Sequence, residues 1–195
     1  MEKLAESQTT ERLVCSRKKD VKVFLLPSGR QFRILAEMQD DVHHMRIEML
    51  VKNPSLRIRE ISCEMPGVPD PCCRKAVNCL QPLIDRQVGP GMTRGLQVSA
   101  EKGCTHLLNL FREACDNLLV SQGVLAREYY TEMFPGISEE QLQHIFLWFR
   151  PHLENSCVRY ATNSAFMDNV RSVELPTGAE KFRAIAKGMG RRPKE

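Results

Sequence analysis

The stretch that decides the fold is residues 92–122, MTRGLQVSAEKGCTHLLNLFREACDNLLVSQ. It predicts a short strand, a tight turn with Gly, and a helix that opens on Gly103-Cys104-Thr105-His106. The helix is indicated by apolar residues at helical spacing: Leu107, Leu108, Phe111, Ala114, Cys115, Leu118 and Leu119. Polar residues fill the other side, so one face of the helix can enter a core while the other meets water.

Cys104 lies at the predicted start of this helix. Unpaired N–H groups and the positive end of the helix dipole favour a thiolate there, which is the reactive and metal-binding form. Cys104 is also in phase with Leu108 and Phe111, so a small buried core residue is the alternative interpretation. His106 lies about 200° around an ideal helix from Cys104. The two side chains can share a metal only if Cys104 precedes the first regular turn.

Four apolar stretches before residue 66 predict strands, because apolar and polar residues alternate in them. They are residues 21–26, 32–36, 42–51 and 56–65. A shift of apolar phase between Ile58 and Ile61 predicts a bulge. His43 is in phase with the apolar side chains of its strand, and His44 with the charged ones. We therefore predict an α+β fold with an antiparallel sheet of three or four strands and helices packed on one side.

Further helices are predicted from capping signals and apolar spacing. Asp70 and Pro71 predict a helix start, with Cys72 and Cys73 in its first turn, where the helix dipole is expected to lower the pKa of a thiol. Another helix is predicted over residues 124–134, and Ser138 with Gln141 predicts a capping box for the next one. Residues 155–175, around Cys157, are predicted to be irregular or strand-like. The predicted organisation is a flexible segment over 1–19, an α+β core over 20–122, a helical elaboration over 123–176 and a flexible basic tail over 177–195.

Composition limits the class of protein. The 195 residues are 42% hydrophobic and carry a net charge of +4, with much of the positive charge in the tail. A basic tail is more often solvated than bound to nucleic acid, so we expect protein partners and no nucleic acid. No apolar run is long enough to span a membrane and no signal peptide is visible. We therefore expect a cytoplasmic protein whose eight cysteines are reduced.

Reduced cysteines serve as core residues, metal ligands or catalytic groups. Neither a Cys-x-x-Cys pair nor a His-Glu-x-x-His motif occurs, which excludes a standard zinc finger. Two predicted helix starts and one strand entry nevertheless carry metal-binding residue types. The candidate ligands are Asp41, His43, His44, Cys72, Cys73, Cys104 and His106. If the fold gathers them, they could hold zinc or an iron–sulfur cluster; otherwise they are core cysteines and satisfied histidines.

The span from about residue 42 to residue 122 resembles an uncharacterised bacterial family, a domain of unknown function. The resemblance rests on a His early in a strand, Met65 followed by Pro69-Asp70-Pro71-Cys72, and the Gly103-Cys104-Thr105-His106-Leu107 helix start. A later Asn155-Ser156-Cys157 segment also fits the family pattern.

The order of elements is also similar to IscU/NifU-type iron–sulfur scaffolds. In those scaffolds a Cys-Gly-Asp-Val loop leads the first strand, whereas this chain has Gln39-Asp40-Asp41-Val42. Their adjacent His-Cys pair is replaced here by Cys104-Thr105-His106. The resemblance implies an IscU-like fold and an association with zinc or an iron–sulfur cluster.

Three functions follow from these observations. The leading hypothesis is a metal-associated or iron–sulfur-associated accessory protein. The second is a thiol-dependent enzyme in which Cys104 or Cys72 is the nucleophile and His44 or His106 the base. The third is a protein-interaction module without site chemistry, in which the aromatic helices of residues 124–150 form a surface for a partner.

Overall fold

The computed structural model describes residues 11–89, residue 92 and residues 103–189. The chain divides into two compact units, residues 1–119 and residues 120–195. The strand predicted after residue 92 falls outside the described residues. Among the described residues, no helix is both long and apolar enough to cross a membrane.

The first unit contains a four-stranded antiparallel sheet with the strand order β1-β2-β3-β4. The strands are β1 (Arg17–Leu25), β2 (Gln31–Asp40), β3 (His44–Lys52) and β4 (Ile58–Gly67). With the helices packed against this sheet, the predicted α+β class is confirmed. β1 begins earlier than predicted because its basic start pairs with the end of β2, where Arg17 lies opposite Asp40.

The bulge predicted in the fourth strand is present. Leu50 pairs with Glu60, while the next residue, Val51, pairs with Ile58, so Arg59 is the extra residue. Because side chains alternate between the faces of a strand, the extra residue brings both Ile58 and Ile61 to the buried face. Both are almost completely buried.

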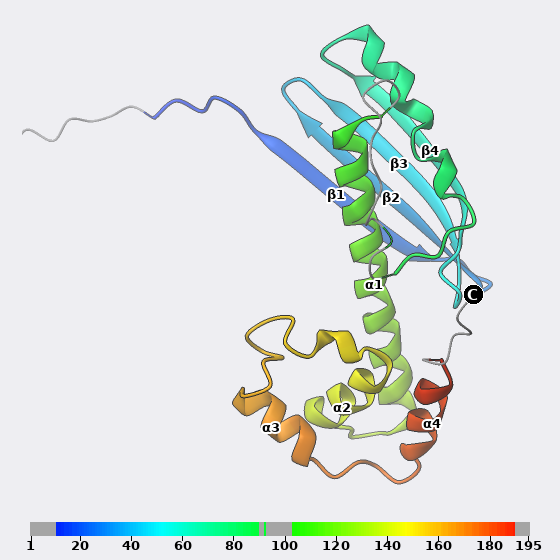
Figure 1. Ribbon diagram of the computed structural model, residues 1–195, viewed down its shortest axis with the longest axis vertical. Helices are drawn as coiled ribbons and strands as arrows, with labels where there is room; N and C mark the ends of the chain where they lie inside the picture. The colour runs from blue at the N-terminus through cyan, green and yellow to red at the C-terminus, as the bar shows by residue number, and fades with distance from the viewer. Residues whose placement is uncertain (1–10, 90–91, 93–102, 190–195) are drawn as a thin grey trace, which may run out of the picture. The chain divides into compact units, whose positions relative to one another are not determined.

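One face of the sheet is apolar and the other is charged. The apolar face buries Phe32, Ile34, Ala36, Met38, Met45, Ile47, Met49 and Val51 from the two central strands. The part of helix α1 (Thr105–Met133) that belongs to this unit, up to residue 119, lies across this face (Figure 1) and buries Leu107, Leu110, Phe111, Ala114 and Leu118 completely. Removing this much apolar surface from water is the main stabilising contribution in this unit.

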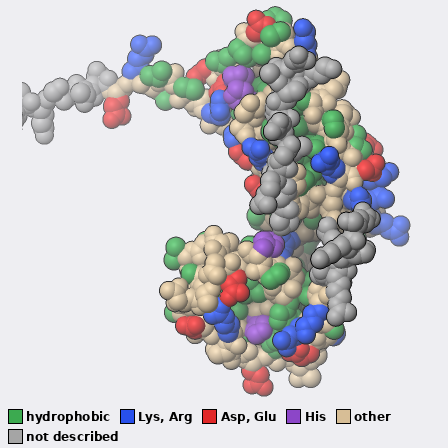
Figure 2. Space-filling model, viewed as in Figure 1, with side chains coloured by type: hydrophobic (Ala, Val, Ile, Leu, Met, Phe, Trp, Pro, Cys, Tyr) green, Lys and Arg blue, Asp and Glu red, His purple; other side chains and the backbone are tan. Residues whose placement is uncertain are grey.

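The open face carries cross-strand ion pairs. Arg33 Nε lies 2.6 Å from Glu48 Oε1, and Arg46 Nε lies 2.9 Å from Glu37 Oε1. Exposed pairs of this kind contribute little to stability, so we interpret this face as solvated. On the other side of the molecule, which is the side of α1 seen in Figure 2, basic and acidic side chains are also interspersed.

Helix α1 is longer than predicted. The sequence predicted one helix that ends near residue 122 and a second that starts at residue 124, but α1 is continuous to Met133. Gly123, which lies between the two predicted helices, is helical, and a Cβ atom there would lie 3.3 Å from the ring of Phe146. Close packing on Phe146 therefore explains why Gly occurs inside this helix.

Between β4 and α1 the chain forms two short 3₁₀-helices, η1 (Pro71–Asn78) and η2 (Gln81–Leu83). The start predicted at Asp70 is confirmed, since its carboxylate accepts the backbone N–H of Cys72 at 2.8 Å. The helix predicted here is a 3₁₀-helix.

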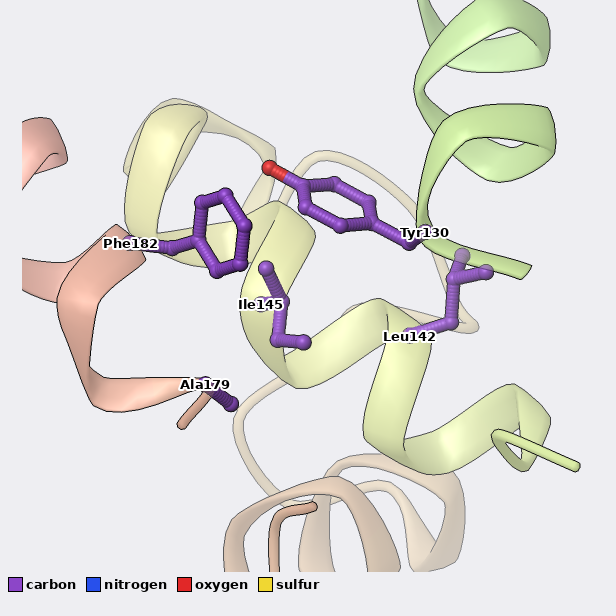
Figure 3. Close-up of a cluster of buried hydrophobic side chains, with 5 residues drawn as sticks. All are labelled: Tyr130, Leu142, Ile145, Ala179 and Phe182. Carbon is purple, nitrogen blue, oxygen red and sulfur yellow. The ribbon is translucent and has the colours of Figure 1, made fainter. Parts of the chain in front are cut away.

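The second unit is helical beyond α1. It contains α2 (Glu139–Phe149), η3 (Pro151–Leu153), α3 (Ala165–Ser172) and α4 (Glu180–Met189). Its core is the cluster shown in Figure 3, which joins Tyr130, Leu142, Ile145, Ala179 and Phe182. The prediction of irregular or strand-like structure over 155–175 is wrong for α3, whose start is capped by Ser164 through a 3.1 Å bond from Met167 N–H. Helix α4 lies in the segment assigned from sequence to a flexible tail.

The capping box predicted at Ser138 is present. Its hydroxyl accepts Gln141 N–H at 3.2 Å, and the Gln141 side chain accepts Ser138 N–H at 2.8 Å. We expect Ser138→Ala to lower the free energy of unfolding of the second unit by about 1 kcal/mol. Ser138→Thr, which keeps the hydroxyl, should cost less. Urea unfolding curves measure both, and an equal loss in the two variants would contradict the capping role.

Candidate functional site

The turn between β2 and β3 is held by the side chain of Asp40. Its carboxylate accepts the backbone N–H groups of Val42 at 2.9 Å and His43 at 2.6 Å. Arg17 Nε and Nη2 donate to the other oxygen at 2.8 and 2.6 Å. An Asp that binds backbone groups two and three residues ahead is a common turn-forming arrangement. These hydrogen bonds, that of Val42 foremost, hold the pKa of Asp40 well below its usual range.

The same carboxylate orients the imidazole of His43. Nδ1 of His43 lies 3.1 Å from Oδ1 of Asp40, and the two side chains are 15% and 3% exposed. A carboxylate beside Nδ1 favours the tautomer that carries its proton there, which leaves a lone pair on Nε2. His43 is therefore fixed in a form that can accept a proton or bind a metal ion.

His106, in the first turn of α1, lies against His43. The two ring centroids are 4.2 Å apart and the ring planes are tilted by 37°. Burial lowers the pKa of His106, and His43 and Arg17 lower it further. A lowered pKa keeps the imidazole neutral near pH 7, and a neutral imidazole is the form that binds metal ions. Two of the seven predicted ligands are thus brought together, and Asp40 rather than Asp41 accompanies them.

The structure places the other predicted histidine and aspartate apart from this pair. His44 lies on the open face of the sheet, where its Nε2 is 2.5 Å from Oε1 of Glu37. Asp41 interacts with the segment before β1: it accepts Ser16 N–H at 3.4 Å and contacts the thiol of Cys15.

Cys72 is exposed and lies beside Asp70, whose carboxylate raises the pKa of the Cys72 thiol. The expectation that the helix start would lower this pKa is therefore wrong, because a full negative charge outweighs the partial charge of a short 3₁₀-helix. Cys73 is half-buried in the same turn. Within the part of the chain that the structure describes, no three or more His, Cys, Asp or Glu side chains are arranged to hold a metal ion.

Cys104, the remaining predicted ligand, has two cysteine neighbours that sequence reasoning did not single out. Burial raises the pKa of Cys79, which the backbone N–H of Cys104 lowers in part, and burial raises the pKa of Cys63 to about 12, to which Cys79 and Cys104 contribute. Cys63 is in phase with the buried residues of β4, Ile61 and Met65. The alternation of β4 could therefore have indicated from the sequence that Cys63 faces the core. No sequence pattern indicated the position of Cys79, which follows η1.

The described residues thus form a small α+β unit with a pair of adjacent histidines, one of which is oriented by a carboxylate, followed by a helical unit. A family of proteins of unknown function, DUF2889, matches residues 16–119. Since this is more than half of the chain, the protein belongs to that family. No curated protein and no solved structure matches the chain, so the expected likeness to IscU/NifU-type scaffolds stays a prediction.

Proposed function

We propose that this protein binds a divalent metal ion of the zinc class through the imidazoles of His43 and His106. The observation that carries the proposal is the close approach of the two rings, 4.2 Å between centroids, beside a carboxylate that orients one of them. Metal-binding histidines commonly donate their other ring N–H to a carboxylate, which sets the tautomer and raises the basicity of the ligand. Asp40 has that relation to His43.

The donor set favours zinc over an iron–sulfur cluster. Imidazole nitrogens suit zinc, copper, iron and nickel, whereas clusters are held mainly by thiolates. Two protein ligands would leave further positions on the ion open. An ion with open positions can take water or a donor from a substrate or partner, which suits an accessory or catalytic role better than a structural one.

The thiol-dependent enzyme is less well supported. Cys72, one of its two proposed nucleophiles, has a raised pKa because of Asp70. A raised pKa lowers the fraction of thiolate near pH 7, and the thiolate is the nucleophile. His44, one of the proposed bases, is paired with Glu37 on the open face.

Isothermal titration of metal-stripped protein with zinc tests the proposal. We expect one bound equivalent, which is lost in His43→Ala and in His106→Ala because each removes one of two direct ligands. Asp40→Asn should weaken binding about 10–100-fold, the usual cost of losing an outer-shell partner.

The matched control is His44→Ala, which removes the neighbouring imidazole on the open face of the sheet and should leave zinc affinity unchanged. The proposal would be wrong if His106→Ala bound zinc as tightly as the original protein. It would equally be wrong if His44→Ala weakened binding as much as His43→Ala. Circular dichroism of each variant checks that the fold is retained.

A further inference from the structure

The two outermost strands of the sheet differ in how their outer edges are covered. At the β4 edge, Ile58 N–H donates to the carbonyl oxygen of Arg86 at 3.0 Å, and the Ile58 carbonyl accepts Asp85 N–H at 2.8 Å. In the described ranges of the chain, β1 is hydrogen-bonded to a strand on one side only (Figure 1). A strand with one open edge is a template on which another strand can pair.

The charges that normally protect such an edge are largely neutralised in β1. Lysine side chains on an edge strand discourage pairing with another chain, and β1 begins with three basic residues, 17–19. Three of the four basic side chains of β1 are each paired with a carboxylate: Arg17 with Asp40, Lys19 with Glu113 and Lys22 with Asp20. The edge is therefore less repulsive to a second strand than its sequence suggests.

The ladder between β1 and β2 decides which residues of β1 face outward. Leu26 N–H donates to the carbonyl oxygen of Gln31 at 2.9 Å, in the same register as the nine pairs of the two strands. Hydrogen-bonded pairs alternate along an antiparallel ladder, so the even-numbered residues of β1 bond to β2. The backbone groups of the odd-numbered residues consequently point away from β2. A further strand can pair only with these.

The sequence of β1 matches itself in one antiparallel register. With Val21 opposite Val21 of a second copy, odd-numbered residues face odd-numbered ones and all nine residues of the strand are paired. Asp20 of each copy then lies opposite Lys22 of the other, on the open face of the sheet. Shifting the centre by one residue would place Asp20 opposite Asp20 or Lys22 opposite Lys22, and like charges directly opposite are destabilising.

The direction of pairing is also set by charge. Antiparallel pairing centred on Val21 places the basic residues 17–19 of the two copies at opposite ends of the joint, beside the apolar residues 23–25 of the other copy. Parallel pairing would bring the two basic stretches together. Only the antiparallel arrangement therefore combines open backbone groups with complementary charges.

We propose that two copies of this protein associate through their β1 edges, antiparallel and centred on Val21, so that the two four-stranded sheets become one continuous sheet. Such a contact has two-fold symmetry, and each favourable pair in it occurs twice. The association uses neither His43 nor His106 and is independent of the zinc proposal.

Sedimentation velocity of the full-length protein tests the proposal, in reducing, low-salt buffer with a chelator and over a range of protein concentrations. We expect an equilibrium between monomer and dimer. Asp20→Lys and Lys22→Asp each turn two attractive pairs into repulsive ones and should weaken the dimer about 10-fold or more. The double variant with both changes restores the opposite charges and should recover most of the original affinity.

Two further variants make the result specific. Glu64→Lys reverses a charge on the open face of β4 and should leave the dimer unchanged. Val21→Pro removes an N–H group that points away from β2, a position where an edge strand accepts Pro. It should abolish the dimer while circular dichroism shows a retained fold.

The proposal is overturned if the original protein is a monomer at every concentration, in which case the edge is open to a strand of another kind. It is also overturned if Asp20→Lys and Lys22→Asp dimerise like the original protein, or if the double variant is as weak as the single ones. His43→Ala should lose zinc and keep the dimer, so the two proposals can fail separately.

Discussion

Replacing Phe111 by Ala should lower the free energy of unfolding by about 3–5 kcal/mol, the usual cost of removing a buried Phe side chain. Phe111 is fully buried in the first unit. It lies in the middle of the apolar stripe of α1, on the helix that crosses the sheet (Figure 1). The change would remove the apolar contacts of the ring and leave a cavity at the centre of the interface between helix and sheet.

Phe111→Leu is the matched control. It keeps most of the volume and should cost less than about 1.5 kcal/mol. Urea unfolding followed by far-ultraviolet circular dichroism measures both variants. If Phe111→Ala lowered the free energy of unfolding by less than about 1 kcal/mol, α1 would not pack on the sheet as described.

The second large effect is expected for Ile145→Ala, which should cost about 2–5 kcal/mol in the second unit. Ile145 is fully buried in the cluster of Figure 3, together with Tyr130, Leu142 and Phe182. Natural domains are stable by only about 5–15 kcal/mol, so this one change should remove a large share of the stability of a small helical unit.

The single tryptophan of the chain allows this effect to be measured locally. Trp148 packs against the same cluster, so its fluorescence reports unfolding of the second unit. Ile145→Val should cost only about 0.5–1.5 kcal/mol. The packing described for this cluster would be contradicted if the original protein and Ile145→Ala had the same unfolding midpoint when unfolding is followed by Trp148 fluorescence.

The sheet and the start of α1 were predictable because their patterns are local. Alternation in residues 32–36 and 42–51 and helical spacing from Leu107 to Leu118 each fix which side chains are buried. The bulge was also visible, since the apolar phase shifts between Ile58 and Ile61. These features require only that each element bury one face.

The length of α1 was not predictable from residues 120–125 alone. Gly123 lowers helix propensity, and the compensating interactions come from elsewhere in the chain. The ring of Phe146 packs close to Gly123, and Arg150 donates to the side chain of Gln122 at 2.9 Å. Tertiary packing overrides the local preference here. Helix α3 was missed for a different reason, because only Met167 and Val170 of its eight residues are buried, which is too few to form a clear period.

For the candidate site, the residue types were predictable but their pairing was not. His43 was placed on the apolar side of its strand by its phase, and His106 in the first turn of α1. That these two rings meet depends on where α1 crosses the sheet, which no local pattern specifies. Asp40 was passed over in favour of Asp41, although its position two residues before Val42 and three before His43 is a signal of a side chain that binds the backbone of a turn.

The central claim is best tested by zinc X-ray absorption on protein loaded with one equivalent of zinc. The account predicts two imidazole nitrogens at about 2.0–2.1 Å, oxygen atoms in the remaining positions and no sulfur. The imidazole signal should disappear in His106→Ala, which no longer binds the ion, and persist in His44→Ala. Sulfur neighbours at about 2.3 Å, or an imidazole signal that His43→Ala and His106→Ala leave unchanged, would contradict the proposed site.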